Sequence, residues 1–210
     1  MYKAVVFDLD GTLLDTTSGV IYAVELTIQQ LGLPRPADDV LKTFVGPPMQ
    51  LSFEKHFGME KERALECANL FRANYRDHSL LIAELYPGVM EVLAYLKNKG
   101  YKIALATNKS HDNAMAILKH FGVADYCDFM LGSDLAGKLK KADIIEKSLE
   151  AIDVDAKDAV YVGDSIFDYE GAQKVGMDFI GVTYGFGFRE GEHYDFPTYH
   201  ALEAITTILT

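Results

Sequence analysis

The sequence predicts an α/β fold: a mostly parallel sheet flanked by helices, with an all-helical segment inserted after the first strand. From about residue 88 onwards, short apolar runs alternate with helical patterns of ten or more residues, as in βαβ units. One further strand pattern lies at the very start of the chain, and residues 15–80 have no strand character. The helical block must therefore interrupt the sheet early.

The composition excludes several functional classes. At 210 residues and 49% hydrophobic, the chain can bury the core of one α/β domain with a smaller insert. The net charge of −11 argues against nucleic-acid or anionic-membrane surfaces, which require basic patches. The N-terminal apolar run is too short for a signal peptide, and no stretch reaches the roughly 18 apolar residues of a membrane span. Cys67 and Cys127 form no metal-binding pair, so we expect reduced, buried thiols in a cytoplasmic protein.

The first strand is expected at residues 3–8, where a β-branched run ends in acidic residues and a glycine. A helix is expected from Thr16 to about Leu31, because apolar residues recur there at helical spacing and Gly32 with Pro34 follow. The other helices of this block are expected at 37–44, 48–57 and 60–79.

The second half of the chain supplies the rest of the sheet. The helices are expected at 88–99, 111–120, 142–151, 166–175 and 199–209. The strands are expected at 101–106, 127–131, 158–162 and 178–183. Because the first strand precedes the helical block, we expect a core domain of residues 1–14 and 84–210 and a helical domain of residues 15–83.

Polar residues follow three of the predicted strands at the point where each strand ends. They are Asp8 to Thr12 after the first strand, Thr107 to Lys109 after the second and Gly163 to Ser165 after the fourth. Because ligands of parallel sheets bind at the carboxyl ends of the strands, we expect these residues to meet. Each group alone also fits a solvated turn or a helix cap. Three such groups in this position are much harder to explain that way.

The residue types indicate phosphoryl transfer. Asp8 and Asp10 repel each other unless a cation lies between them, Asp164 arrives at the same edge, and Asp168 follows one helical turn later. Oxygen ligands without histidine or cysteine suit Mg²⁺. Hydroxyl, amide and ammonium groups around such a cation can stabilise a phosphoryl oxyanion, and a carboxylate can attack phosphorus directly.

Three motifs give the whole chain a resemblance to the haloacid dehalogenase-like hydrolases, in the subgroup with a Rossmann-like core and a helical cap after the first strand. Residues 7–13, FDLDGTL, look like the first motif, DxDGT. Residues 104–108, ALATN, resemble the second motif, and residues 162–168, VGDSIFD, resemble the fourth, GDSxxD. The resemblance implies a Mg²⁺-dependent phosphatase that hydrolyses a small phosphorylated metabolite through an aspartyl-phosphate.

The resemblance also implies a role for each matched residue. Asp8 would be the nucleophile, and Asp10 the general acid/base that protonates the leaving alcohol and then activates water. Thr107 would hold the phosphoryl oxygens. The implied metal ligands are Asp8, Asp10, Asp164 and Asp168. The implied phosphate- or substrate-binding residues are Leu9 and Asn108 in the core and Thr16, Gly46 and Pro47 in the cap.

The third motif of the family is a lysine, often followed by proline. This chain instead has GKLKKAD at residues 137–143. Lys141 begins a Lys-Ala-Asp-Ile-Ile pattern seen in some phosphatases of this kind, so we assign the third motif to Lys141. Lys138 is the alternative.

Individual residues within the motifs narrow the reaction. Dehalogenases and phosphonate hydrolases of this family lack the second aspartate, so Asp10 favours phosphate esters. Sugar phosphomutases with the same cap usually carry valine where this chain has Thr12, so Thr12 favours a phosphatase. The chain resembles phosphoglycolate phosphatases most, but the GPP sequence at residues 46–48 is also similar to 5′-nucleotidase-like members. The sequence leaves both substrates open.

Two other classes remain as alternatives. A phospho-receiver module uses similar residues without turnover, but its acid pair and phospho-acceptor lie on different strands and it has no helical cap. A binding module with inactive motifs is disfavoured because every catalytic residue type is present. The segment Tyr184–Phe188 alternates aromatic residues with glycine, and we expect a structural loop there, since the acidic chain offers no charge for nucleic acid. We expect a monomer or homodimer.

Overall fold

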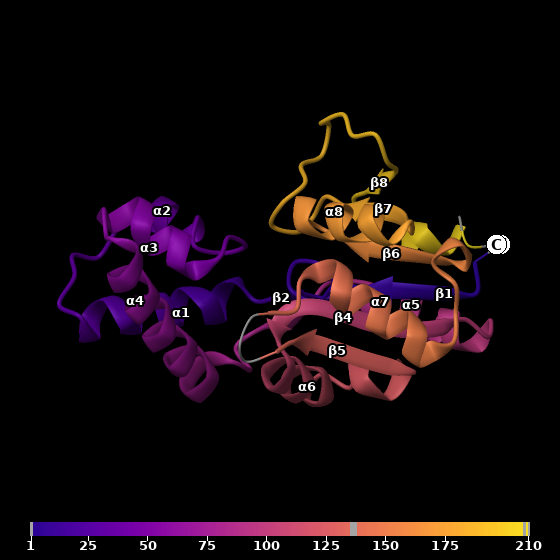
Figure 1. The fold of residues 1–210 in the computed structure, drawn as a ribbon, viewed down its shortest axis with the longest axis horizontal. Helices are drawn as coiled ribbons and strands as arrows, with labels where there is room; N and C mark the ends of the chain where they lie inside the picture. Colours follow the sequence, from indigo (N-terminus) through magenta and orange to yellow (C-terminus); the bar gives the residue numbers. More distant parts are fainter. Residues whose placement is uncertain (1, 135–137, 208, 210) are drawn as a thin grey trace. The chain divides into compact units, whose positions relative to one another are not determined.

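A computed structural model describes residues 2–134, 138–207 and 209 (Figure 1). The chain divides into two compact units. The first, which we call the core unit, comprises Met1–Asp15 and Leu85–Thr210, and the second, the helical unit, comprises Thr16–Glu84.

Within the described residues, the core unit contains a six-stranded sheet in the order β5-β4-β1-β6-β7-β8, with parallel pairings throughout. The strands are β1 (Ala4–Phe7), β4 (Lys102–Ser110), β5 (Phe129–Ser133), β6 (Ala159–Gly163), β7 (Asp178–Val182) and β8 (Thr198–Tyr199). Counted along the core alone, this is the 3-2-1-4-5-6 order of Rossmann-type sheets. The predicted fold class is therefore confirmed.

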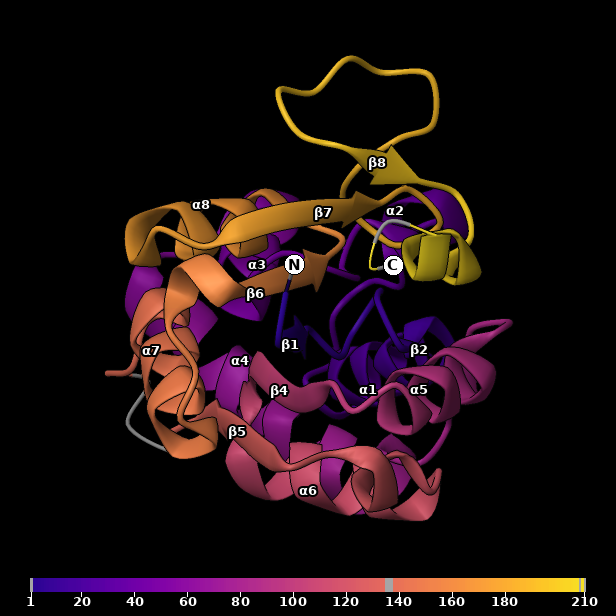
Figure 2. The same ribbon diagram turned by 90° about the vertical axis from the view of Figure 1, so that its right-hand side faces the viewer.

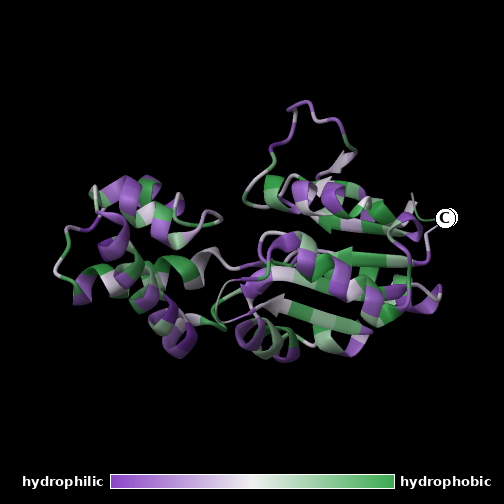
Figure 3. Cartoon of the chain, viewed as in Figure 1, coloured by the Kyte–Doolittle hydropathy of each residue, from purple (hydrophilic) through white to green (hydrophobic). Residues whose placement is uncertain are grey.

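Helices cover both faces of this sheet. α7 (Lys141–Ile152) and α8 (Ile166–Val175) lie on one face, and α5 (Val89–Asn98) and α6 (His111–His120) on the other (Figure 2). All four residues of β1 are buried, as a strand covered on both faces requires, and the sheet is hydrophobic in Figure 3. Short 3₁₀ turns complete the connections: η2 (Val123–Tyr126) and η3 (Ala156–Asp158).

The central position of β1 decides where the site forms. Phe7 pairs with Leu105 of β4 on one side and with Val162 of β6 on the other. The chain runs from β1 to one half of the sheet and later returns to build the other half, so β1 borders the topological switch point. The three strands that precede the predicted motifs therefore end side by side.

The helical unit contains four α-helices and a π-helical turn among its described residues. They are α1 (Thr17–Gln30), α2 (Asp38–Lys42), α3 (Met49–Phe57), α4 (Lys61–Asn74) and η1 (Tyr75–Ser79). The helix expected at 60–79 thus changes to π geometry in its last turn. Two strands that the sequence did not indicate, β2 (Leu14–Asp15) and β3 (Glu84–Leu85), form a separate two-stranded sheet.

The helix expected at residues 199–209 is wrong. Tyr199 belongs to β8, which pairs with β7, and only a 3₁₀ helix, η4 (Leu202–Thr207), follows. Leu202 and Ile205 are both buried, and a spacing of three residues matches one turn of a 3₁₀ helix. The pairing of β8 uses backbone groups that an α-helix starting at 199 would need. Ile208 lies outside the described residues.

Both cysteines are free thiols, as expected. Cys67 is buried in the helical unit, whereas Cys127 in the core unit keeps some exposure. Burial raises the pKa of the Cys127 thiol to about 12. In the part of the chain that the structure describes, no helix has the length and apolar character needed to cross a bilayer.

Gly19→Ala tests the close contact between α1 and η1. A Cβ atom at Gly19 would lie 2.5 Å from the Ile82 carbonyl oxygen and 2.6 Å from that of Ser79, whose hydroxyl also donates to the Gly19 carbonyl. Alanine normally stabilises a helix interior by about 1 kcal/mol relative to glycine. Here we expect a destabilisation of about 1–3 kcal/mol in urea unfolding, because the neighbouring backbone must move. Ser18→Ala, at an exposed position of the same helix, should not be destabilised.

Candidate active site

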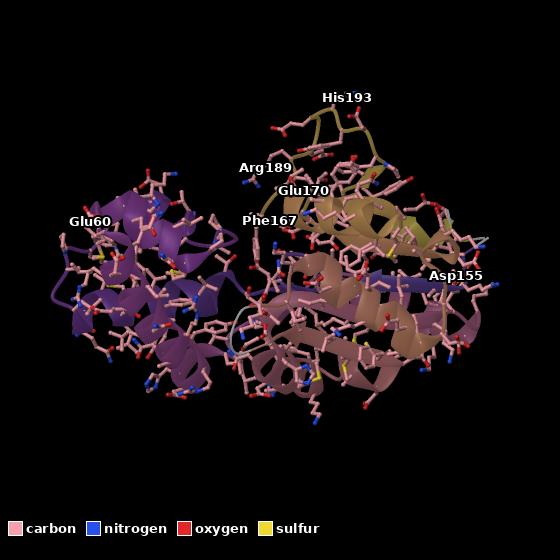
Figure 4. The ribbon with its side chains drawn as sticks, viewed as in Figure 1. Glu60, Asp155, Phe167, Glu170, Arg189 and His193 are labelled. Atoms are coloured by element: carbon pink, nitrogen blue, oxygen red, sulfur yellow. The ribbon has the colours of Figure 1, made fainter. Side chains whose placement is uncertain are left out.

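The polar strand ends meet at the carboxyl edge of the core sheet. Phe167, in the first turn of α8, marks this end of the core unit, and Asp155 marks the opposite end (Figure 4). Asp8 follows β1 directly and is buried. Its backbone N–H donates to the Val162 carbonyl at 3.0 Å, which continues the β1–β6 ladder by one residue. The sheet itself therefore fixes Asp8.

Lys141 binds Asp8 from the first residue of α7. Its Nζ lies 2.6 Å from Asp8 Oδ1, 2.7 Å from Asp168 Oδ1 and 3.0 Å from the Ala106 carbonyl oxygen. These three acceptors match the three donors of an ammonium group. Burial lowers the pKa of Lys141, but Asp168 and Asp8 outweigh burial and hold that pKa above its usual value. Lys141 therefore stays charged inside the protein.

The start of α7 explains why Lys141 reaches the site. The Asp143 carboxylate accepts a hydrogen bond from the Lys140 backbone N–H at 2.8 Å, which fixes the first turn of the helix. Lys138 is exposed, and its backbone N–H donates to Asp134 Oδ1 at 2.8 Å. The side chain of Lys141 contacts the carboxylates whereas that of Lys138 is exposed, which favours Lys141 for the third motif.

Three buried carboxylates form a cluster suited to a cation. One oxygen each from Asp8, Asp164 and Asp168 lie within 4.8 Å of one another. Burial and the charges of Asp168 and Asp8 raise the pKa of Asp164 to about 8. Burial, followed by Asp168, likewise raises the pKa of Asp8, against the opposing effect of Lys141. One ammonium group is thus too little positive charge for three carboxylates, and this oxygen-only set fits a divalent metal ion.

Asp168 is held at both oxygens. Ser165 donates to Oδ2 from its backbone N–H at 3.1 Å and from its hydroxyl at 2.6 Å. Lys141 contacts Oδ1, and the Tyr161 hydroxyl lies 3.4 Å from the same oxygen. Ser165 and Asp168 thus hold each other at the start of α8, and the role of Asp168 as a metal ligand stays a prediction.

The loop Tyr184–Phe188 contacts Asp164, which the sequence did not predict. The backbone N–H groups of Phe186 and Gly187 donate to Asp164 Oδ2 at 2.6 and 3.3 Å. A Cβ atom at Gly185 would lie 2.2 Å from the Gly11 carbonyl oxygen and 2.5 Å from Asp164 Cβ. The alternating glycines were the available signal, since they permit this close backbone approach.

Asp10, a predicted metal ligand, is not in the carboxylate cluster. Its two oxygens instead accept hydrogen bonds from Lys109 Nζ, at 2.9 and 3.0 Å. Lys109 follows a predicted strand, but no sequence motif indicated a role for it. Thr107 is buried, its Oγ1 accepts the Lys109 backbone N–H at 3.2 Å, and Asn108 between them is exposed.

Leu9 and Thr12 belong to the turn after β1. Leu9 is buried, and its carbonyl accepts the N–H groups of Thr12, Leu13 and Leu14 at 2.9–3.2 Å. The Thr12 hydroxyl is buried and has no hydrogen-bond partner among the described residues. The preference for a phosphatase drawn from Thr12 therefore rests on the family resemblance alone.

The predicted cap residues lie in the helical unit. Thr16 is buried at the N-cap of α1, and Gly46 and Pro47 are exposed in the segment before α3. Their proposed contact with substrate stays a prediction.

This chain is similar to a known family and to several known proteins. Residues 5–182 match the family described as haloacid dehalogenase-like hydrolase. A 5′-nucleotidase of Pseudomonas aeruginosa is 31% identical, over 96% of this chain and 92% of its own length. A phosphoglycolate phosphatase of Neisseria meningitidis is 33% identical, over 88% of this chain and 82% of its own. The crystal structure of a predicted phosphatase from Clostridium acetobutylicum, 32% identical, covers 100% of this chain and 99% of its own, with a TM-score of 0.87.

Gly185→Ala should weaken the binding of a divalent cation. The added methyl group would displace the loop that orients Asp164, and we expect at least about a tenfold loss of affinity, as for other residues that orient metal ligands. Isothermal titration with Mn²⁺ measures this directly. Arg189→Ala, at an exposed position directly after this loop, is the matched control and should bind as the wild type does. Equal affinities in all three proteins would mean that the loop does not support the cluster.

Proposed function

Because this chain belongs to the haloacid dehalogenase-like hydrolase family, we propose that it is a Mg²⁺-dependent phosphatase that acts through an aspartyl-phosphate on Asp8. One observation carries the proposal. The Asp8 carboxylate, at the end of the central strand, is bound by Lys141 and lies in the buried cluster with Asp164 and Asp168. Asp8 is thus held in one orientation beside a positive charge. Attack on a phosphoryl group requires both an oriented nucleophile and positive charge near the phosphoryl oxygens.

Asp8 attacks phosphorus in the first step. Lys141 binds Oδ1, so Oδ2 is the oxygen that forms the new bond to phosphorus while the bond to the leaving oxygen breaks. The Lys141 ammonium also offers positive charge to the phosphoryl oxygens as negative charge develops on them. Thr107, buried at the end of the neighbouring strand, is the hydroxyl we assign to one of these oxygens.

Asp10 acts as the general acid in the first step and as the general base in the second. It protonates the leaving alcohol oxygen as the ester bond breaks, and then takes a proton from the water that attacks phosphorus. The bond between phosphorus and Asp8 breaks in that second step, which releases inorganic phosphate and restores the Asp8 carboxylate. A partly exposed carboxylate beside the nucleophile suits exchange with both an alcohol and water.

Asp8, Asp164 and Asp168 are the residues we assign to Mg²⁺. When bound, Mg²⁺ supplies positive charge that offsets the carboxylates and the phosphoryl group. Asp10 was also expected as a metal ligand, and that assignment stays a prediction. The contacts of its side chain with Lys109 support the role in proton transfer.

The substrate we propose is a small phosphomonoester of the phosphoglycolate type. The similarity to phosphoglycolate phosphatases supports this substrate. The residues of the core determine the type of reaction, but they do not determine which leaving group is accepted. Hydrolysis of nucleoside 5′-monophosphates is the second candidate, favoured by the 5′-nucleotidase relative that matches 96% of the chain. Comparison of kcat/KM for 2-phosphoglycolate and the nucleoside monophosphates decides between them. A receiver-type module would show no turnover of either, or of an aryl phosphate.

Asp8→Asn should abolish turnover of 4-nitrophenyl phosphate, with a loss greater than about 100-fold, because an amide cannot form the acyl phosphate. Excess EDTA should abolish wild-type activity in the same way, and added Mg²⁺ should restore it. Asp112→Asn, an exposed aspartate of the core unit, controls for loss of charge. Circular dichroism checks the fold of each protein. An Asp8→Asn protein that keeps a tenth of wild-type turnover would rule out the covalent route.

Lys141→Ala and Lys138→Ala should differ sharply. Lys141 contacts two carboxylates of the cluster, whereas Lys138 is exposed. We expect turnover of 4-nitrophenyl phosphate to fall by at least about 100-fold in Lys141→Ala and by less than about threefold in Lys138→Ala. The opposite pattern would transfer the third motif to Lys138.

A further inference from the structure

We propose that Lys109 is a positioning residue that holds the Asp10 carboxylate in the orientation needed for proton transfer. The inference rests on the proposed function and adds a residue to it. Lys109 Nζ lies 2.9 Å from Asp10 Oδ1 and 3.0 Å from Oδ2, so both oxygens face one ammonium group. An ammonium group at nearly equal distances from both oxygens fixes the position of the carboxyl group and the direction in which it points.

The backbone of β4 aims Lys109 at Asp10. The β4–β5 register is regular up to Thr107, which pairs with Gly132, and then shifts before Ser110. Such irregularities redirect side chains at the ends of strands. The Thr107 hydroxyl accepts the Lys109 N–H, and a Cβ atom at Gly132 would lie only 2.5 Å from the Lys109 carbonyl oxygen. Contacts at both the N–H and the carbonyl group of Lys109 therefore fix its backbone, from which the side chain extends towards Asp10.

Burial makes the pair strong. The Lys109 side chain is 8% exposed and that of Asp10 is 28% exposed. An ammonium group removed from water requires a partner, and the charge interaction is less screened there than at the surface. Asp10 lies outside the cluster of Asp8, Asp164 and Asp168. Lys109 pairs with Asp10, whereas Lys141 pairs with Asp8.

Lys109 should affect only the reaction steps in which Asp10 transfers a proton. 4-Nitrophenolate is a weak base and leaves without a proton, whereas an alkoxide needs the proton that Asp10 supplies. Water attack on the aspartyl-phosphate needs Asp10 whatever the substrate. Loss of Lys109 should therefore spare phosphorylation by an aryl phosphate, but slow phosphorylation by alkyl phosphates and hydrolysis of the intermediate.

Rapid-mixing kinetics of Lys109→Met test this directly. With 4-nitrophenyl phosphate, we expect a first-turnover burst within about threefold of wild type, but steady-state turnover reduced at least about tenfold. With 2-phosphoglycolate and adenosine 5′-monophosphate, the steady-state rate should also fall at least about tenfold. Lys109→Arg should recover most of the loss. Lys102→Met, on the same strand but exposed, should match wild type.

Two further measurements separate this role from others. The inhibition constant of inorganic phosphate should change less than about threefold in Lys109→Met, because positioning Asp10 does not bind phosphate. Lys109→Met should have less than about a twofold effect on turnover in an Asp10→Asn background, since its partner is already lost. This double variant removes both charges of the Asp10–Lys109 pair, so it provides a test if the single variant does not fold.

Three outcomes would overturn the inference. A slower aryl burst with a phosphate inhibition constant raised about tenfold would make Lys109 a phosphate-binding residue. Unchanged kinetics in Lys109→Met would make the ion pair irrelevant to the reaction. A full additional loss in the Asp10→Asn background would show that Lys109 does not act through Asp10. Failure of the proposed function itself is distinct, because wild type would then show neither burst nor turnover with any of the three substrates.

Discussion

The buried ammonium group of Lys141 is the interaction on which the core of this protein depends. It joins Asp8 at the end of β1, Asp168 in α8 and the Ala106 carbonyl of β4 through three contacts of 2.6–3.0 Å. An ammonium group buried without such acceptors would be strongly unfavourable, and so would carboxylates buried without it. Because each partner belongs to a different element, the charges can be satisfied only when β1, β4, α7 and α8 are assembled together. The same contacts thus stabilise the fold and hold Asp8, the proposed nucleophile, in place.

Small residues and backbone groups complete the site around these charges. Asp164 receives two backbone N–H groups from the loop after β7, and that loop approaches only because Gly11 and Gly185 have no side chains. Tyr161 lies beneath the site, where its hydroxyl donates to the Ala106 carbonyl at 2.6 Å and its ring centroid lies 5.3 Å from Lys141 Nζ. Such a layer fixes the charged groups before any ligand arrives, which is what preorganisation requires.

Charge in the site is divided into two separate groups. Lys141 neutralises part of the carboxylate cluster, and the remaining negative charge favours a cation. Lys109 pairs with Asp10 outside that cluster. Asp8 and Asp10, the proposed nucleophile and proton-transfer residue, therefore have different environments although they are only two positions apart in the chain. Carboxylates in different environments can take different roles in one reaction.

Features that depend on residues close together in the chain could be predicted from the sequence. Strand and helix periodicity gave the α/β class and the helical insertion, and the residue types after each strand gave the candidate site, because both are local properties. Which charged side chains pair with each other depends on the tertiary structure. Lys109 and Asp10 are separated by 99 residues and Lys141 and Asp8 by 133, so no local pattern encodes these pairs. The strand at Thr198–Tyr199 likewise exists only because β7 is present to pair with it, which local helical spacing in the C-terminal segment cannot reveal.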